Sequence, residues 1–283
     1  MGETIQVTNT WPGYANLKHL VVFGDSYSDV GYNSKANHPS RDRPLGVDYP
    51  GITWAEADQP NWVGYLVTEY VFSPVLVYDY AVGGDTVAGV RRQMERHFLP
   101  TVAKKPHWAP WAAEDTLFVT WIGINDCAYN GCDDNIAELV KLQEQLYEVG
   151  ARNFCFIDVP PMERSPAANR ASTGNNPCKN WNSSLRTQVQ AFAAAHPDAT
   201  IFIFSSHRTF SRILNDPISH GFSAIDTVTP YGEIWVDRLH PTTRMHDWIA
   251  KDFSFFLDSR KPIKNAEGDT NSAAESSTQA SKS

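Results

Sequence analysis

Five short apolar runs, each ended by a glycine, a proline or a polar turn, constrain the fold of this 283-residue chain more than any other feature. Runs of this length with such boundaries are typical of buried β-strands. They occupy residues 20–23, 75–78, 117–122, 154–159 and 201–204. Helical periodicity alternates with them over residues 87–98, 136–149 and 183–195, and a last amphipathic helix is predicted over 245–256.

Strands connected by crossover helices form a mostly parallel sheet that is covered on both faces. The pattern therefore predicts an α/β fold, a three-layer α/β/α sandwich with a mostly parallel five-stranded sheet. Ligands in such folds bind beyond the carboxyl ends of the strands. We expect one domain over residues 1–259, because residues 260–283 are rich in Ser, Ala and Asn without aromatics and predict a disordered tail or linker remnant.

Charge and hydropathy exclude several classes of partner. The net charge is −8, which disfavours binding to nucleic acid. No apolar stretch approaches the roughly 20 residues that cross a bilayer, so no membrane partner is expected. His240 and His246 lack a metalloprotease pattern, and no metal or other cofactor is expected. We expect a monomer that acts on a small molecule.

The four cysteines allow three pairings. Cys127 and Cys132 are close enough in sequence to bridge the loop after Asn125, and we predict that disulfide. Cys155 and Cys178 either form a second bridge or leave Cys155, inside an apolar run, as a buried thiol.

A candidate nucleophile and its base lie near opposite ends of the chain. Ser26 follows the first apolar run in a short turn after Gly24, which suits an exposed nucleophilic hydroxyl. The Gly-x-Ser-x-Gly elbow of α/β-hydrolases does not occur. Asp237 precedes His240 by three residues, close enough to orient the imidazole so that its other nitrogen faces a serine. Each fragment alone is also a common surface turn.

Two further turns offer hydrogen-bond donors for an oxyanion. Asn125 follows the third apolar run and has an amide with two donors. Gly84 follows the second run and offers a backbone N–H, with Gly83 as the adjacent alternative. Alone, each of these is an ordinary turn or helix-entry residue.

Four motifs, in this order, resemble the signature blocks of SGNH/GDSL hydrolases: FGDSYSDVG, AVGGD, GIND and DRLHP. The chain is most similar to fungal acetylesterases of carbohydrate esterase family 16, through TWPGY, YPG, NWVGYL, LYEVGARNF and VPPMERSP. The resemblance implies Ser26 as nucleophile, His240 as general base and Asp237 as its orienting acid. It also implies an oxyanion hole of the Ser26 and Gly84 N–H groups and the Asn125 amide.

This resemblance further implies a secreted enzyme acting on plant polysaccharides, although residues 1–10 lack the apolar centre of a signal peptide. We expect hydrolysis of acetyl esters on carbohydrates such as acetylated xylo-oligosaccharides through an acyl-serine intermediate. A lipid-directed GDSL esterase and a non-catalytic carbohydrate-binding protein of the same fold are the alternatives. Tyr27, where many GDSL enzymes have Leu, argues against close analogy to long-chain lipases.

Neighbours of the motifs receive secondary roles. Asp25 and Asp126 are interpreted as hydrogen-bond acceptors that order the loops beside the reacting groups. Trp121 and Trp235 each lie two residues before one of the motifs and Tyr27 follows the nucleophile, so these three are candidate substrate contacts.

Overall fold

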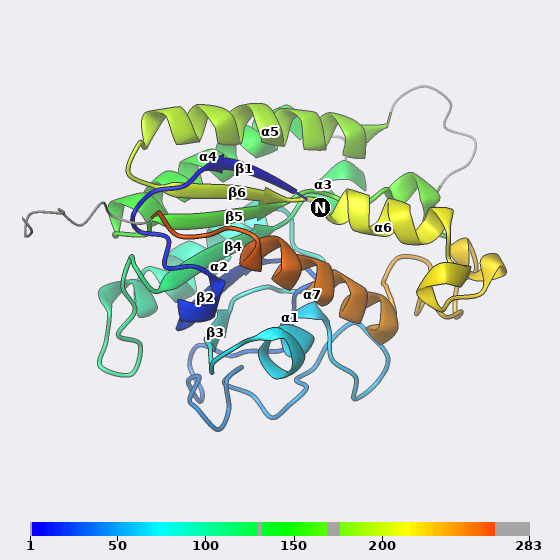
Figure 1. Ribbon diagram of the computed structural model, residues 1–283, viewed down its shortest axis with the longest axis horizontal. Coiled ribbons are helices and arrows are strands. Elements are labelled where there is room, and N and C mark those ends of the chain that lie inside the picture. The colour runs from blue at the N-terminus through cyan, green and yellow to red at the C-terminus, as the bar shows by residue number, and fades with distance from the viewer. Residues whose placement is uncertain (1, 129–131, 169–175, 264–283) are drawn as a thin grey trace, which may run out of the picture.

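A computed structural model describes residues 2–128, 132–168 and 176–263, and it contains a six-stranded sheet between two layers of helices (Figure 1). The strand order is β1-β6-β5-β4-β2-β3. The strands are β1 Gly2–Gln6, β2 His19–Gly24, β3 Leu76–Asp79, β4 Thr116–Trp121, β5 Asn153–Ile157 and β6 Thr200–Phe204.

The five predicted strands are β2 to β6, and they pair in parallel throughout. Every residue of β2, β4, β5 and β6 is buried, as expected for strands covered on both faces. The chain winds outward from β2 to β3 on one side and from β4 to β6 on the other. The order reverses between β2 and β4, and at such a switch point a crevice opens beyond the carboxyl ends.

The helices are distributed over both faces of the sheet (Figure 1). Helices α4 and α5 pack on each other and α4 also contacts α2, whereas α7 packs against α1 and α6. The α-helices are α1 Trp62–Tyr65, α2 Val87–Gln93, α3 Ile124–Ala128, α4 Cys132–Glu148, α5 Pro177–Ala195, α6 Ser206–Asn215 and α7 Thr243–Asp258. Short 3-10 turns are η1 Tyr14–Asn16, η4 Val102–Lys104, η5 Met162–Arg164, η6 Ile218–His220 and η7 Ala224–Thr227, and π turns are η2 Leu66–Tyr70 and η3 Met94–Phe98.

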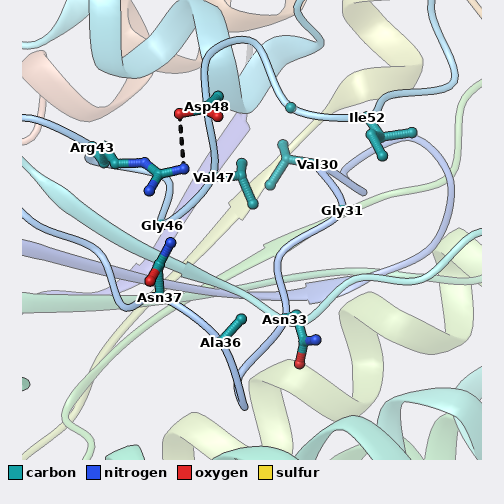
Figure 2. Close-up of a pocket in the computed structure, with 11 residues that line it drawn as sticks. Val30, Gly31, Asn33, Ala36, Asn37, Arg43, Gly46, Val47, Asp48 and Ile52 are labelled. Atoms are coloured by element: carbon teal, nitrogen blue, oxygen red, sulfur yellow. Dashed lines mark ion pairs between the residues drawn. The ribbon is translucent and has the colours of Figure 1, made fainter.

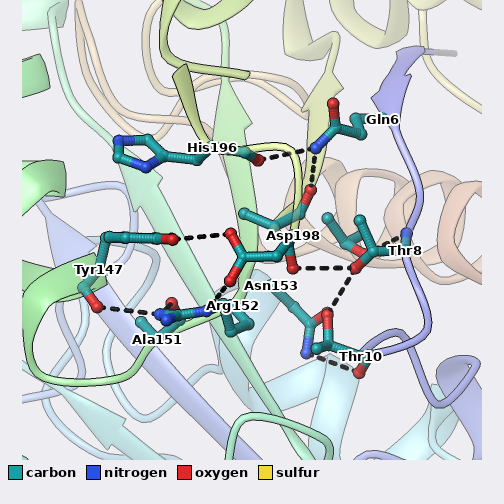
Figure 3. A network of polar contacts seen from close by, with 11 residues as sticks. Gln6, Thr8, Thr10, Tyr147, Ala151, Arg152, Asn153, His196 and Asp198 are labelled. Atoms are coloured by element: carbon teal, nitrogen blue, oxygen red, sulfur yellow. Dashed lines mark hydrogen bonds and ion pairs between the residues drawn. The ribbon is translucent and has the colours of Figure 1, made fainter. Parts of the chain in front are cut away.

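The expectation of five strands misses β1, which pairs antiparallel with β6 at the edge of the sheet. This strand is only half-buried and has no apolar run, so polar contacts hold it in place (Figure 3). The Gln6 amide donates to the carbonyls of His196 (2.8 Å) and Ala199 (2.6 Å), and the Thr8 N–H donates to the Thr200 hydroxyl (2.9 Å). The sheet is therefore mixed, with one antiparallel edge.

The helix after β3 also differs from its predicted form. Its N-cap is Thr86, and the Asp85 carboxylate accepts hydrogen bonds from Arg92 (2.7 Å) and Gln93 (2.8 Å). The helix changes to a π turn after Gln93, although the apolar stripe continues. Asp85 is thus bound to the last turn of α2.

The last helix, α7, ends at Asp258, close to the predicted end of the domain. Of the predicted tail, residues 264–283 lie outside the described residues, and the domain boundary stays a prediction. Within the described ranges, no helix is long and apolar enough to cross a membrane.

Candidate active site

Three turns meet beyond the carboxyl ends of β2, β3 and β4, at the switch point of the sheet. Ser26 follows β2, Gly84 follows β3, and Asn125 lies in the first turn of α3 after β4. A fourth segment, the loop before α7, brings His240 to the same place. Parallel strands whose ends share one edge therefore bring together four motifs that are far apart in sequence.

The Ser26 turn is fixed by close backbone packing. A Cβ atom at Gly24 would lie 2.6 Å from the carbonyl oxygen of Trp121, so the first position of this turn requires glycine. The Asp25 carboxylate accepts the N–H of Tyr27 (3.1 Å), and the Asp25 carbonyl accepts the N–H of Ser28 (3.0 Å). The serine hydroxyl consequently has little freedom of position.

Ser26, His240 and Asp237 form a continuous hydrogen-bonded series. The Ser26 Oγ lies 3.0 Å from Nε2 of His240, and Nδ1 of His240 lies 2.7 Å from the second carboxylate oxygen of Asp237. The first oxygen accepts the N–H groups of Leu239 (2.6 Å) and His240 (2.7 Å). Asp237 thus orients both the imidazole and the loop that carries it, the geometry needed for a general base beside a nucleophile.

The surroundings of the Asp237 carboxyl stabilise its charged form. Partial burial raises its pKa, but hydrogen bonds from the His240 ring and from two backbone N–H groups outweigh burial. The pKa consequently lies below its ordinary value. The carboxylate therefore stays negative well into acid conditions and favours an N–H on Nδ1 of His240.

We predict that kcat/KM falls on acidification, once His240 is protonated. A neutral His240 accepts the Ser26 proton, whereas an imidazolium has no lone pair for it. Because the pKa of Asp237 lies below its ordinary value, protonation of that carboxylate does not cause the fall in mild acid. The measurement is a pH profile of kcat/KM, with unfolding monitored at each pH as the control. A profile that stays flat would contradict the role of His240.

The two adjacent glycines differ in whether the backbone N–H is already hydrogen-bonded. The Gly83 N–H donates to the Asp29 carboxylate (2.9 Å) and is therefore occupied. Gly84 is exposed with φ of +80°, a conformation that favours glycine. The Asn125 amide donates one hydrogen to the Asp85 carbonyl (2.9 Å), which fixes its plane and leaves its second N–H for an oxyanion. Gly84 and Asn125 are thus the better-placed donors.

Two buried acids flank these groups. Asp25 is fully buried, and burial raises the pKa of its carboxyl to about 7. Burial likewise raises the pKa of Asp126, whose carboxylate accepts hydrogen bonds from the Val87 N–H (3.2 Å) and the Asn135 amide (2.7 Å). Asp126 thus joins its own segment to α2 and α4, whereas the Asp25 carboxylate orders the Ser26 turn from within. A protonated Asp25 would reduce the negative charge beside Ser26.

The three aromatic residues expected to contact substrate are all fully buried, contrary to that expectation. Trp121 packs edge-on against Tyr27 with ring centroids 5.4 Å apart. The Trp235 ring N–H donates to the carbonyl of Thr227 (3.1 Å). The Tyr27 hydroxyl donates to the Leu239 carbonyl (2.6 Å), which ties the histidine loop to the serine turn. These buried side chains therefore hold the loops of the site in place and do not line it.

Gln93 has a role in the site that its sequence position does not reveal. Its side chain exchanges two hydrogen bonds with the backbone of Gly24, at 3.1 and 2.7 Å, and donates to Asp85 at 2.8 Å. The serine turn and the Gly84 turn are therefore joined through one buried amide. Gln93 lies within the helical pattern of residues 87–98, and that pattern gives no sign of a role in the site.

Trp54 is the aromatic residue that does border the triad. Its ring stacks on His240, with centroids 5.0 Å apart and planes inclined by 28°, and 46% of the residue remains exposed. It lies between the short apolar runs and carries no periodic signal, so the sequence alone favours core packing over sugar stacking for this residue.

The structure decides between the two alternatives for Cys155. Cys155 and Cys178 do not form a disulfide, and Cys155 is a buried thiol in β5. The pKa of Cys178 is lowered chiefly by a hydrogen bond with Cys127, which places α5 beside the segment after Asn125. The Cys132 side chain lies outside the described residues, so the Cys127–Cys132 bridge stays a prediction.

A cavity of about 400 Å³ lies beside the segment that follows the serine turn (Figure 2). Arg43 and Asp48 form an ion pair of 2.8 Å at its wall. None of the three residues of the Ser26 series lines it. The lining residues are Val30, Gly31, Asn33, Ala36, Asn37, Arg43, Gly46, Val47, Asp48, Gly51 and Ile52.

The fold and the hydrogen-bonded serine, histidine and aspartate define the class of serine hydrolases with a GDSL-type α/β fold. The chain belongs to the GDSL-like Lipase/Acylhydrolase family, which matches residues 22–248. The protein is accordingly a carboxylic ester hydrolase.

Two fungal relatives are similar over most of their length. An acetylesterase of Thermothelomyces thermophilus is 31% identical over 265 residues, which cover 83% of this chain and 87% of the relative. An acetylesterase of Hypocrea jecorina is 20% identical over 316 residues, which cover 87% of this chain and 90% of the relative.

Solved structures show the same fold at low sequence identity. An acetylxylan esterase of Geobacillus stearothermophilus is 15% identical with a TM-score of 0.54, covering 89% of this chain and 99% of its own. An α/β hydrolase from the metagenome of Lake Arreo is 15% identical with a TM-score of 0.55, covering 90% of this chain and 99% of its own.

Proposed function

We propose that the protein is a secreted acetylesterase that removes acetyl groups from carbohydrates, such as acetylated xylo-oligosaccharides. The observation that carries the proposal is the 3.0 Å contact between Ser26 Oγ and Nε2 of His240, at a switch point that also presents Gly84 and Asn125. The names of the two fungal relatives support acetyl as the acyl group.

The proposed mechanism follows from these positions. His240 takes the proton of Ser26 as Oγ attacks the ester carbonyl, and the negative oxygen that forms accepts hydrogen bonds from Gly84, Asn125 and the Ser26 N–H. His240 then returns the proton to the leaving alcohol oxygen. A water molecule, deprotonated by the same imidazole, hydrolyses the acetyl-Ser26 ester and regenerates the serine.

A lipid-directed esterase is the second candidate, because large apolar side chains are exposed on segments that adjoin the site. Ile52 is 81% exposed near Trp54, and Ile225 and Tyr231 are 73% and 82% exposed on the segment leading to Asp237. Exposed apolar patches of this kind mark interaction surfaces, including lipid surfaces. A non-catalytic binding protein is disfavoured, because the complete hydrogen-bonded series is present.

Acyl-chain length separates the two candidates. We expect kcat/KM to decline from acetate through butyrate to octanoate esters of one alcohol, because the two fungal relatives are acetylesterases and a site that fits acetyl gains nothing from added methylenes. An apolar channel would instead gain roughly fourfold per methylene, from about 0.8 kcal/mol of burial. The measurement is kcat/KM for the three esters, together with acetate release from acetylated xylo-oligosaccharides. A rise towards octanoate would favour the lipid-directed esterase.

A further inference from the structure

Trp54 combines two properties that distinguish it from the other aromatic residues near the site. It stacks on the imidazole of His240 at 5.0 Å, and 46% of it is exposed. Trp62, Trp121 and Trp235 are fully buried. The indole therefore presents apolar surface to solvent directly beside the base.

The orientation of this indole is fixed from two sides. The carboxylate oxygen of Asp29 that accepts the Gly83 N–H (2.9 Å) also accepts the Trp54 ring N–H (3.3 Å). A Cβ atom at Gly83 would lie 2.3 Å from the indole, so the ring packs directly on the glycine turn. Asp29 is thus a positioning residue that couples the Trp54 ring to the turn preceding Gly84.

The direction of proton transfer decides which part of an ester meets Trp54. His240 returns its proton to the oxygen of the departing alcohol, so that oxygen must lie within hydrogen-bond reach of Nε2. The aromatic surface adjoining that imidazole is the exposed part of Trp54. Aromatic rings bind the apolar C–H faces of sugars, and a ring held in advance loses little conformational entropy on binding.

We propose that Trp54 is the specificity-determining platform on which the sugar of the alcohol part stacks; this rests on the proposed function. Trp54 then selects carbohydrate esters over esters of small alcohols. Its action is on the alcohol part, whereas chain-length selection concerns the acyl part. The platform therefore makes a separate contribution to specificity.

The test separates binding from turnover. In a Ser26→Ala background, we expect Trp54→Ala to weaken binding of an acetylated xylobiose about tenfold in calorimetry, and Trp54→Phe to weaken it by less than about threefold. In the active enzyme, Trp54→Ala should lower kcat/KM for that ester about tenfold more than for ethyl acetate. The ratio removes any common loss caused by disturbance of His240.

Equal losses for both esters, with an unchanged dissociation constant, would overturn the platform and leave Trp54 as a support for His240. The failure of the proposed function would appear earlier, in the parent proteins. If the Ser26→Ala protein does not bind acetylated xylobiose and the unmodified enzyme does not hydrolyse it, the proposed carbohydrate specificity is rejected. The Trp54 platform is then rejected as well.

Discussion

Replacement of Ser26 by alanine should lower kcat by about 10⁶-fold, the loss typical of a serine nucleophile. The hydroxyl is the one group within hydrogen-bond reach of Nε2 of His240 in the described contacts, and alanine leaves that base without a proton to accept. Ser26 is 4% exposed, and removing one oxygen from this fixed turn leaves its backbone hydrogen bonds in place. The measurement is kcat on an acetate ester at neutral pH.

The matched control is Ser73→Ala. Ser73 is exposed, and its hydroxyl donates to the carbonyl of Ala15 (3.2 Å), before β2 and away from the strand ends that carry the site. This variant should keep the activity of the unmodified enzyme. If Ser26→Ala, correctly folded by its thermal transition, keeps more than about a hundredth of the activity, Ser26 is not the nucleophile.

Replacement of Asn125 by alanine should lower the acylation rate by roughly 10²- to 10³-fold, the usual effect of removing one oxyanion donor. The amide is held by the Asp85 carbonyl at 2.9 Å, so its second N–H is already aimed before substrate arrives. The rate of acylation in a single turnover is the appropriate measurement. We expect the effect mainly in this rate and much less in the affinity for the ester.

Asn16→Ala provides the comparison for Asn125→Ala. The Asn16 amide also donates to a backbone carbonyl, that of Pro12 (2.9 Å), but it lies in η1, before β2 begins. It should change neither rate nor affinity. An acylation rate for Asn125→Ala equal to that of Asn16→Ala would remove Asn125 from the oxyanion hole.

The parallel strands were predictable because burial on both faces leaves a continuous apolar signal. Every one of β2 to β6 overlaps a predicted run, and the turns after β2, β3 and β4 carry Ser26, Gly84 and Asn125 as expected. The edge strand β1 was not predictable in this way, since its residues are mostly half-exposed and polar contacts hold it. The sequence of β1 alone does not predict a strand, and β1 forms by pairing with β6.

The wrong expectations for aromatic residues have a different cause. Trp121 and Trp235 lie near motifs in sequence, but both side chains are fully buried in the core. Trp121 is the last residue of β4, and its side chain enters the core while the following turn forms the site. Trp54 reaches His240 only through the tertiary fold, by its hydrogen bond to Asp29. Proximity to the motifs in sequence therefore selected Trp121 and Trp235, which are buried beside the site. It did not select Trp54, whose exposed ring borders His240.

The most direct test of an acyl-serine mechanism is to trap the intermediate. The enzyme is mixed with an activated acetate ester, the reaction is stopped with acid during turnover, and the peptides are mapped by mass spectrometry. Acid stops the reaction because a protonated His240 cannot activate the water that cleaves the acetyl-enzyme. We expect one acetyl group on the peptide that contains Ser26, and none on that peptide in Ser26→Ala. Full turnover with no acetyl group on Ser26, or with an acetyl group on another residue that forms and decays at the turnover rate, would contradict the assignment.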